Sequence, residues 1–117
     1  MASIQRQIVY AATALTATTT NGDALSLIAR AQCPIGYLVV TAPNGATTVA
    51  AKIQHSPDGV TGWTDFITFT TTGEGAVANQ IAKPTNGSVL PYVRAVVVLG
   101  GDTQVATVVV FLYTEPF

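Results

Sequence analysis

Residues 49–72 constrain the possible fold more than any other part of the chain. Their first half alternates in polarity, and the apolar positions on one side are Val49, Ala51 and Ile53. This two-residue period is typical of a half-buried strand. The sequence Ser56-Pro57-Asp58-Gly59 then favours a tight turn. The second half supplies large core side chains, Trp63, Phe66, Ile67 and Phe69. We therefore predict a β-hairpin that anchors a core.

Short apolar runs separated by glycine, proline and asparagine continue on both sides of this hairpin. We expect strands over 24–29, 35–42, 76–82, 89–99 and 104–113. The last two flank Gly100-Gly101-Asp102, so we predict that they form a second hairpin. Seven or eight antiparallel strands without a convincing helix predict an all-β fold, a single β-sandwich. Its topology is jelly-roll-like or, alternatively, immunoglobulin-like.

The amino-terminal residues 1–22 allow two interpretations. Ile4, Ile8, Ala11 and Leu15 are spaced as on a helix, whereas the many threonines of this segment are β-branched and favour extended chain. We prefer an extended amino-terminal arm with a first strand over 1–22. The β-sandwich domain then occupies 23–117.

Charge is scarce in this sequence. Charged residues make up 9% of the chain and the net charge is −1, whereas soluble domains carry about 25%. With only 5 Lys and Arg, we expect neither nucleic-acid binding nor electrostatic attachment to a membrane. A monomer with so few charges is poorly protected against association. We infer that other protein covers much of its surface.

The final two predicted strands support the same inference, because both of their faces are apolar. In 104–113 the residues Val105, Val109, Phe111 and Tyr113 alternate with Val108, Val110 and Leu112. In a two-layer sandwich only one face of a strand meets the core. The other face must be covered by another subunit or remain an exposed apolar patch.

The sequence offers no catalytic constellation. His55 is the only histidine and Cys33 the only cysteine, which excludes a His pair, a disulfide within the chain and a cysteine-based metal site. We expect Cys33 to be a small buried side chain and His55 to be structural. Asp58 and Asp65 alone would supply too few oxygen ligands for calcium. Asp58 is better explained as a turn residue and Asp65 as a residue at the entry of a strand. We therefore expect no enzyme activity, no metal and no cofactor.

Trp63 has two interpretations. The preferred one is a core aromatic residue. The alternative is a stacking platform for a sugar, as in carbohydrate-binding modules, which would require an exposed ring.

Two motifs resemble a group of small tailed-bacteriophage structural proteins, the capsid decoration or cement proteins. The first, KIQHSPDGVTGWTDF, matches their Q-x-S-x-D-G hairpin followed by W-T-D, and the second, PYVRAVVVLGGDTQVATVVVFL, matches their Y-hydrophobic-R-A segment and final strand. Together they lie within residues 46–113. The resemblance implies a β-sandwich that binds the outside of the phage head.

The resemblance also implies a function: a virion protein, made in the bacterial cytoplasm, that bridges neighbouring major capsid proteins as a homodimer or homotrimer. We expect the partner interface to comprise the arm and one face of the final hairpin, and the residues are Ile4, Arg6, Ile8, Tyr10, Val108, Val110 and Leu112. Two alternatives are a tail, neck or fibre component of the virion and a carbohydrate-binding module.

Overall fold

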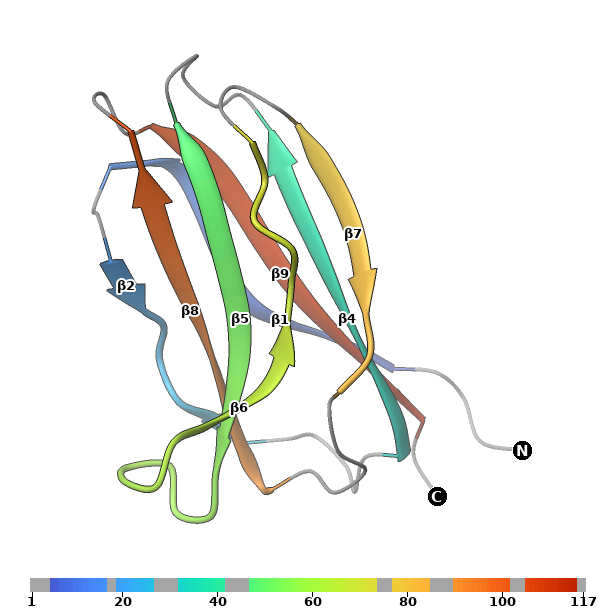
Figure 1. Ribbon diagram of the computed structural model, residues 1–117. Coiled ribbons are helices and arrows are strands. Elements are labelled where there is room, and N and C mark those ends of the chain that lie inside the picture. Colours follow the sequence, from blue (N-terminus) through green and yellow to red (C-terminus); the bar gives the residue numbers. More distant parts are fainter. Residues whose placement is uncertain are drawn as a thin grey trace.

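A computed structural model describes residues 5–16, 19–26, 32–41, 47–73, 77–84, 90–101 and 105–115. In these ranges the chain forms nine strands: β1 (Gln5–Leu15), β2 (Thr19–Asn21), β3 (Leu25–Ser26), β4 (Gln32–Thr41), β5 (Thr48–Ser56), β6 (Thr64–Thr68), β7 (Ala78–Ala82), β8 (Tyr92–Gly100) and β9 (Ala106–Glu115). They build two antiparallel sheets that face each other (Figure 1). The predicted all-β sandwich is confirmed. The described part of the chain contains no helix of the length and apolarity that a membrane crossing requires.

The strand order identifies the sandwich as a jelly roll. One sheet has the order β1-β9-β4-β7, and the other has the order β2-β8-β5-β6, with β3 also paired to β8. The pairs β1–β9, β2–β8, β4–β7 and β5–β6 are nested around the middle of the chain. Such a chain is one long hairpin that has been rolled up, with its successive strand pairs assigned alternately to the two sheets. The immunoglobulin-like alternative is therefore not adopted.

The central hairpin lies where the sequence predicts it. Strands β5 and β6 pair antiparallel, and Val49, Ala51 and Ile53 all point into the core. At the turn, Gly59 adopts a φ of 77°, which favours glycine because a side chain is strained there. A register shift between Ile53 and Gln54 marks an irregularity opposite β6. This shift lets two successive residues of β6, Phe66 and Ile67, both be buried.

The predicted hairpin between the last two strands is wrong. Strand β8 pairs with β5, β2 and β3, whereas β9 pairs with β1 and β4 in the opposite sheet. The connection after Gly100 therefore crosses from one sheet to the other (Figure 1). Glycines permit such a crossing as readily as a tight turn. In the nested pairing only β5 and β6 are consecutive partners.

The expected amino-terminal arm is largely a strand of the sandwich. Residues 5–15 form β1, which pairs with β9 from Gln5 to Leu15, and its Val9 is buried in the core. The structure thus favours the extended interpretation of this segment over the helical one. The predicted first strand that stops at Asn21 is β2, on the opposite sheet.

One continuous core fills the space between the sheets. Its buried members are Val9, Leu38, Val40, Val49, Ala51, Ile53, Phe66, Ile67, Phe69, Val93, Ala95, Val97, Leu99, Ala106, Val108, Val110 and Leu112. Gly36 of β4 permits close packing at this level, since a Cβ there would lie 2.9 Å from the Phe69 ring. The single chain thus buries a core of its own.

Candidate interaction surface

The outer face of the β1-β9-β4-β7 sheet carries apolar side chains on each of its strands. Pairing register places Tyr37 of β4 beside Phe111 of β9, and Phe111 beside Ile8 of β1. On the other side of Tyr37 lies Ile81 of β7. Because paired residues share a face of the sheet, one patch runs across all four strands. We call this patch the aromatic face, and its members are Ile8, Ile35, Tyr37, Val39, Ile81, Val109, Phe111 and Tyr113.

Three rings form the centre of the aromatic face. The ring centre of Tyr37 lies 6.2 Å from that of Phe111 and 6.3 Å from that of Tyr113. The Phe111 and Tyr113 centres are also 6.3 Å apart. These separations are those of favourable tilted aromatic pairs. All three rings are half-buried in the free chain, so each still offers surface to a partner.

Aliphatic side chains at the two edges of the aromatic face are more exposed than its centre. Ile8 is 51% exposed and Ile81 is 68% exposed. Strand spacings of about 4.8 Å and rises of about 3.3 Å give the patch a projected area of roughly 300 Å². The largest apolar patch of a soluble monomer has about this size and is often functional. None of these eight residues carries a charge, but Arg6, whose backbone pairs with that of Tyr113 in β1–β9, belongs to the same face by register.

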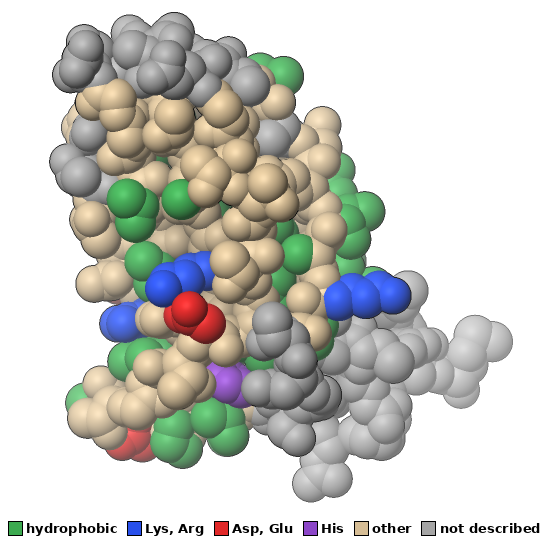
Figure 2. Space-filling view, in the orientation of Figure 1, with side chains coloured by type: hydrophobic (Ala, Val, Ile, Leu, Met, Phe, Trp, Pro, Cys, Tyr) green, Lys and Arg blue, Asp and Glu red, His purple; other side chains and the backbone are tan. Residues whose placement is uncertain are grey.

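The opposite sheet has a different outer face. Figure 2 shows acidic and basic side chains gathered in its lower half, on the side of the β5–β6 loop. Here Lys52 Nζ lies 3.0 Å from Asp65 Oδ1, and Gln54 Nε2 donates to the same oxygen at 3.0 Å. The hydrogen bond from the Gln54 amide lowers the pKa of Asp65, and the hydrogen bond from Lys52 lowers it further by a smaller amount. The charges on the described part of this sheet thus belong to an internal network of polar side chains.

The structure divides the predicted interface residues into two groups. Val108, Val110 and Leu112 are fully buried in the core, so their assignment to a partner surface is wrong. They do share one face of β9, as predicted, but the face that remains open carries Val109, Phe111 and Tyr113. Because both faces are apolar, alternation alone does not tell which one meets the core.

The predicted interface residues of the arm occupy different positions. Ile8 lies on the aromatic face, and Tyr10 is half-buried and packs against the core. The backbone of Arg6 pairs with Tyr113 in β1–β9. Ile4 lies outside the described residues, as does the side chain of Cys33. Ile8 is therefore the predicted residue that belongs to the candidate surface.

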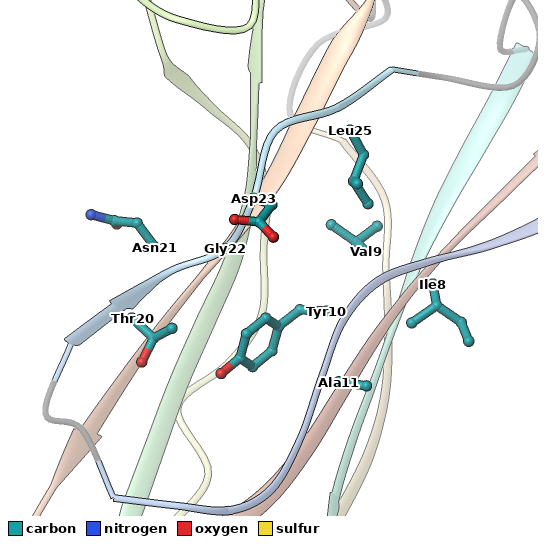
Figure 3. Close-up of a pocket in the computed structure, with 9 residues that line it drawn as sticks. All are labelled: Ile8, Val9, Tyr10, Ala11, Thr20, Asn21, Gly22, Asp23 and Leu25. Atoms are coloured by element: carbon teal, nitrogen blue, oxygen red, sulfur yellow. The ribbon is translucent and has the colours of Figure 1, made fainter.

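Tyr10 borders a hollow between β1 and the segment that joins β2 to β3. The hollow has a volume of about 460 Å³ and is lined by Ile8–Ala11, Thr20–Asp23 and Leu25. Figure 3 shows Val9 facing Leu25, and a Cβ at Gly22 would lie 3.4 Å from Cδ1 of the Tyr10 ring. Gly22 N–H donates to the Ala95 carbonyl at 2.7 Å, which ties this segment to β8. The lining residues include one carboxylate, Asp23, and the hydroxyl groups of Tyr10 and Thr20, but no histidine, lysine or cysteine to act with them.

Trp63 is not a core residue, so the preferred interpretation of this side chain is wrong. It is half-buried on the outer side of the β2-β8-β5-β6 sheet, and the guanidinium carbon of Arg94 lies 4.4 Å from its ring centre. A cation over an indole face is a favourable arrangement. The Arg94 contact thus accounts for the position of the Trp63 ring without a ligand.

His55 is structural, as the sequence predicts. Its ring stacks on Phe66 with centres 4.6 Å apart, and its Nδ1 accepts the Leu90 N–H at 3.2 Å. Burial lowers the pKa of His55, because a low-dielectric environment disfavours the charged form. The neutral ring therefore holds the chain after residue 89 against β5.

Asp58 organises the turn between β5 and β6. It accepts the Thr61 N–H at 2.8 Å, the Val60 N–H at 2.9 Å and the Thr61 hydroxyl at 2.9 Å. These donors hold the pKa of Asp58 well below its usual range. Its oxygens are thus engaged within the turn. No three residues among the described His, Cys, Asp and Glu side chains gather closely enough to hold a metal ion.

Comparison with known proteins links the fold to virus particles. The structure resembles a chain of infectious bursal disease virus, Gt strain, with a TM-score of 0.61 and 15% identity, covering 97% of this chain and 32% of that one. The Gx strain gives a TM-score of 0.57 at 13% identity, covering 98% and 32%. The VP2 subviral particle of the same virus gives 0.55 at 16%, covering 97% and 33%. The chain therefore spans about a third of the length of these proteins. It shares the β fold of the matching part of those chains.

Comparison of sequences adds no relative: no protein family and no curated protein matches the chain.

Sequence reasoning missed most of the aromatic face. Tyr37, Phe111 and Ile81 were not among the expected interface residues, although a usable signal was present. Ile35, Tyr37 and Val39 occupy alternate positions of one strand, and Val109, Phe111 and Tyr113 occupy alternate positions of another. Their proximity depends on the pairing of β4 with β9, which no local sequence pattern predicts.

Proposed function

We propose that this protein is a structural component of a virion that decorates the outer surface of a phage capsid. It bridges neighbouring major capsid proteins, with which it makes its principal contacts. The proposal includes association of the protein with itself as a dimer or trimer. It involves no catalysis, cofactor or nucleic acid.

The observation that carries the proposal is the aromatic face. The chain buries a core of its own, yet it leaves an apolar patch with three rings at its centre on the outer side of one sheet. Aromatic residues are enriched where proteins bind one another, and charged residues are depleted at the centre of such contacts. A patch of this kind is explained by a protein partner that covers it.

Two further observations support the proposal without identifying the particle. The fold resembles chains of infectious bursal disease virus particles, and the two sequence motifs resemble those of phage decoration proteins. Both are compatible with a protein whose role is to fill and connect surfaces. Proteins of this kind need contact area rather than reactive groups.

The test is co-sedimentation with capsids of the phage that carries the gene, using variants that alter the aromatic face. Ile81→Lys and Ile8→Lys place a charge on exposed positions of this face and should leave the fold intact. Val60→Lys is the matched control, since Val60 is 76% exposed on the loop beyond β5 and outside the aromatic face. We expect the wild type and Val60→Lys to bind at a fixed ratio to the capsid protein.

The two isoleucine variants should lose at least tenfold in capsid affinity, because burying an unpaired ammonium group is costly. Circular dichroism and thermal unfolding establish that each variant is folded. If folded Ile81→Lys and Ile8→Lys occupy capsids as fully as the wild type, the aromatic face is not the contact. If the wild type does not bind capsids, the decoration role itself fails.

A further inference from the structure

Arg94 stands on the outer face of the other sheet and is held in one orientation from two sides. It is opposite Gln54 in the β5–β8 register, and its Nε–H donates to Gln54 Oε1 at 3.0 Å. Its guanidinium group lies over the Trp63 ring at 4.4 Å. One hydrogen bond along its edge and one stacking contact on its face therefore fix the plane of the guanidinium group.

The orientation of Gln54 is fixed in turn. Its Nε2 donates to Asp65 Oδ1 at 3.0 Å, and the same oxygen lies 3.0 Å from Lys52 Nζ. Because the amide nitrogen faces the carboxylate, the amide oxygen is directed toward Arg94. Lys52, Asp65 and Gln54 thus form a chain of polar contacts that ends at the guanidinium group.

Among the described residues, no carboxylate pairs with Arg94. The one ion pair in the described part of the chain joins Lys52 and Asp65, and Asp65 bonds to Gln54 rather than to Arg94. The terminal nitrogens of Arg94 make no hydrogen bond to the described residues. These nitrogens carry N–H donors in a planar fork that matches the two oxygens of a carboxylate. The site is therefore arranged in advance for an anion that the described residues do not supply.

We propose that Arg94 and Trp63 form a binding site for a carboxylate group, contributed by an aspartate or glutamate side chain of a partner protein. The indole ring shields one face of the guanidinium group from water, which strengthens a charge-assisted hydrogen bond at its edge. Gln54 holds the fork so that little freedom is lost on binding.

The site also suits a bridging protein. It lies on the sheet opposite to the one that bears the aromatic face, so one molecule can contact two neighbours with different surfaces. This use of the site depends on the proposed function. Recognition of a carboxylate by Arg94 does not, and it is measured on the isolated protein.

The probe is N-acetyl-glutamate N-methylamide, titrated into the ¹⁵N-labelled protein and followed by NMR. Trp63 is the only tryptophan, so its indole N–H signal is assigned without ambiguity, and the Arg94 Nε–H signal provides a second reporter. We expect both signals to shift saturably, with a dissociation constant on the order of 10 mM for so small a ligand. N-acetyl-glutamine N-methylamide and sodium chloride at equal ionic strength serve as controls and should produce no saturable shift.

Two substitutions test the geometry. Arg94→Gln should weaken binding at least tenfold, and Arg94→Lys should also weaken it because an ammonium group lacks the planar fork. Lys83→Gln removes one positive charge just after β7, where Lys83 is exposed, and should bind as the wild type does. A cooperative thermal transition for each variant shows that it is folded.

The proposal is overturned if the glutamine analogue or chloride shifts both signals as the glutamate probe does. It is also overturned if Arg94→Gln binds as tightly as the wild type, or if inorganic phosphate binds more tightly than the carboxylate. These outcomes leave the capsid test unaffected, since that test concerns the opposite sheet.

Discussion

Gln80 connects the two sheets at one open side of the sandwich, and its substitution should lower stability by a predictable amount. It lies on the edge strand β7 opposite Leu38. Its Nε2 donates to the Thr70 carbonyl at 2.7 Å, and its Oε1 accepts the Thr70 N–H at 2.9 Å. The side-chain amide thus pairs with the segment after β6 as a neighbouring strand would. A third and longer bond reaches Thr72 Oγ1 at 3.3 Å.

The expected cost of Gln80→Ala follows from these bonds. An internal hydrogen bond contributes about 1 kcal/mol net, so the two short bonds to Thr70 contribute about 2 kcal/mol together. Thr70 is exposed, so water can hydrogen-bond to its backbone groups in the variant and recover part of the lost free energy. We expect a loss of about 1–2 kcal/mol, or a fall in Tm of roughly 4–8 °C for a domain of this size.

The assay is urea unfolding followed by circular dichroism, with thermal unfolding as a second measure. Gln80→Glu keeps the acceptor for the Thr70 N–H and loses the donor, so it should lie between the wild type and Gln80→Ala. Asn79→Ala is the matched control, because Asn79 is the exposed neighbour on the same strand and should cost less than about 0.5 kcal/mol. Equal stability of Gln80→Ala and the wild type, or an equal loss in Asn79→Ala, would refute the proposed link between the sheets.

Two further predictions concern the interior. Gly36→Ala places a Cβ 2.9 Å from the Phe69 ring, so it should cost about 1–3 kcal/mol by overpacking, measured by urea unfolding. Burial lowers the pKa of His55 in the folded state; the unfolded chain therefore takes up the proton first, and stability should decline as the pH falls below about 6.5. His55→Asn, whose amide oxygen can still accept the Leu90 N–H, should show a smaller decline over the same range. An unchanged pH dependence in this variant would exclude His55 as the cause.

The elements with a clear two-residue period were predictable from the sequence. In 49–53 the alternation of apolar and polar residues identifies both the strand and its buried face, because only one side is apolar. The turn at Ser56-Pro57-Asp58-Gly59 was predictable for a local reason as well, since Ser56 Oγ accepts the N–H groups of Asp58 and Gly59. Local chemistry was sufficient in both cases.

The elements that depend on long-range pairing were not predictable in the same way. In 104–113 both faces are apolar, so alternation correctly grouped Val108 with Val110 but assigned that face to a partner instead of the core. The glycines after Leu99 are compatible with a hairpin and with a crossing between sheets. The aromatic face depends on the crossing between sheets, because Tyr37 and Phe111 are distant in sequence. They are adjacent only through the pairing of β4 with β9.

Trp63 illustrates a third limit. An aromatic residue near a strand is usually assigned to the core, and for Phe66 this holds. Trp63 instead lies over Arg94, a residue far along the chain. Its environment is set by the β5–β8 register, which no local pattern reveals.

Coverage of the aromatic face can be measured directly by hydroxyl-radical footprinting with mass spectrometry. The oxidation of Tyr37, Phe111 and Tyr113 is compared between the free protein and the protein bound in its virus particle, with Val60 as an internal reference. We predict that the three rings react in the free protein and are protected in the particle, whereas Val60 reacts in both. Rings that remain as reactive in the particle as in solution would contradict the proposal that another subunit covers this sheet.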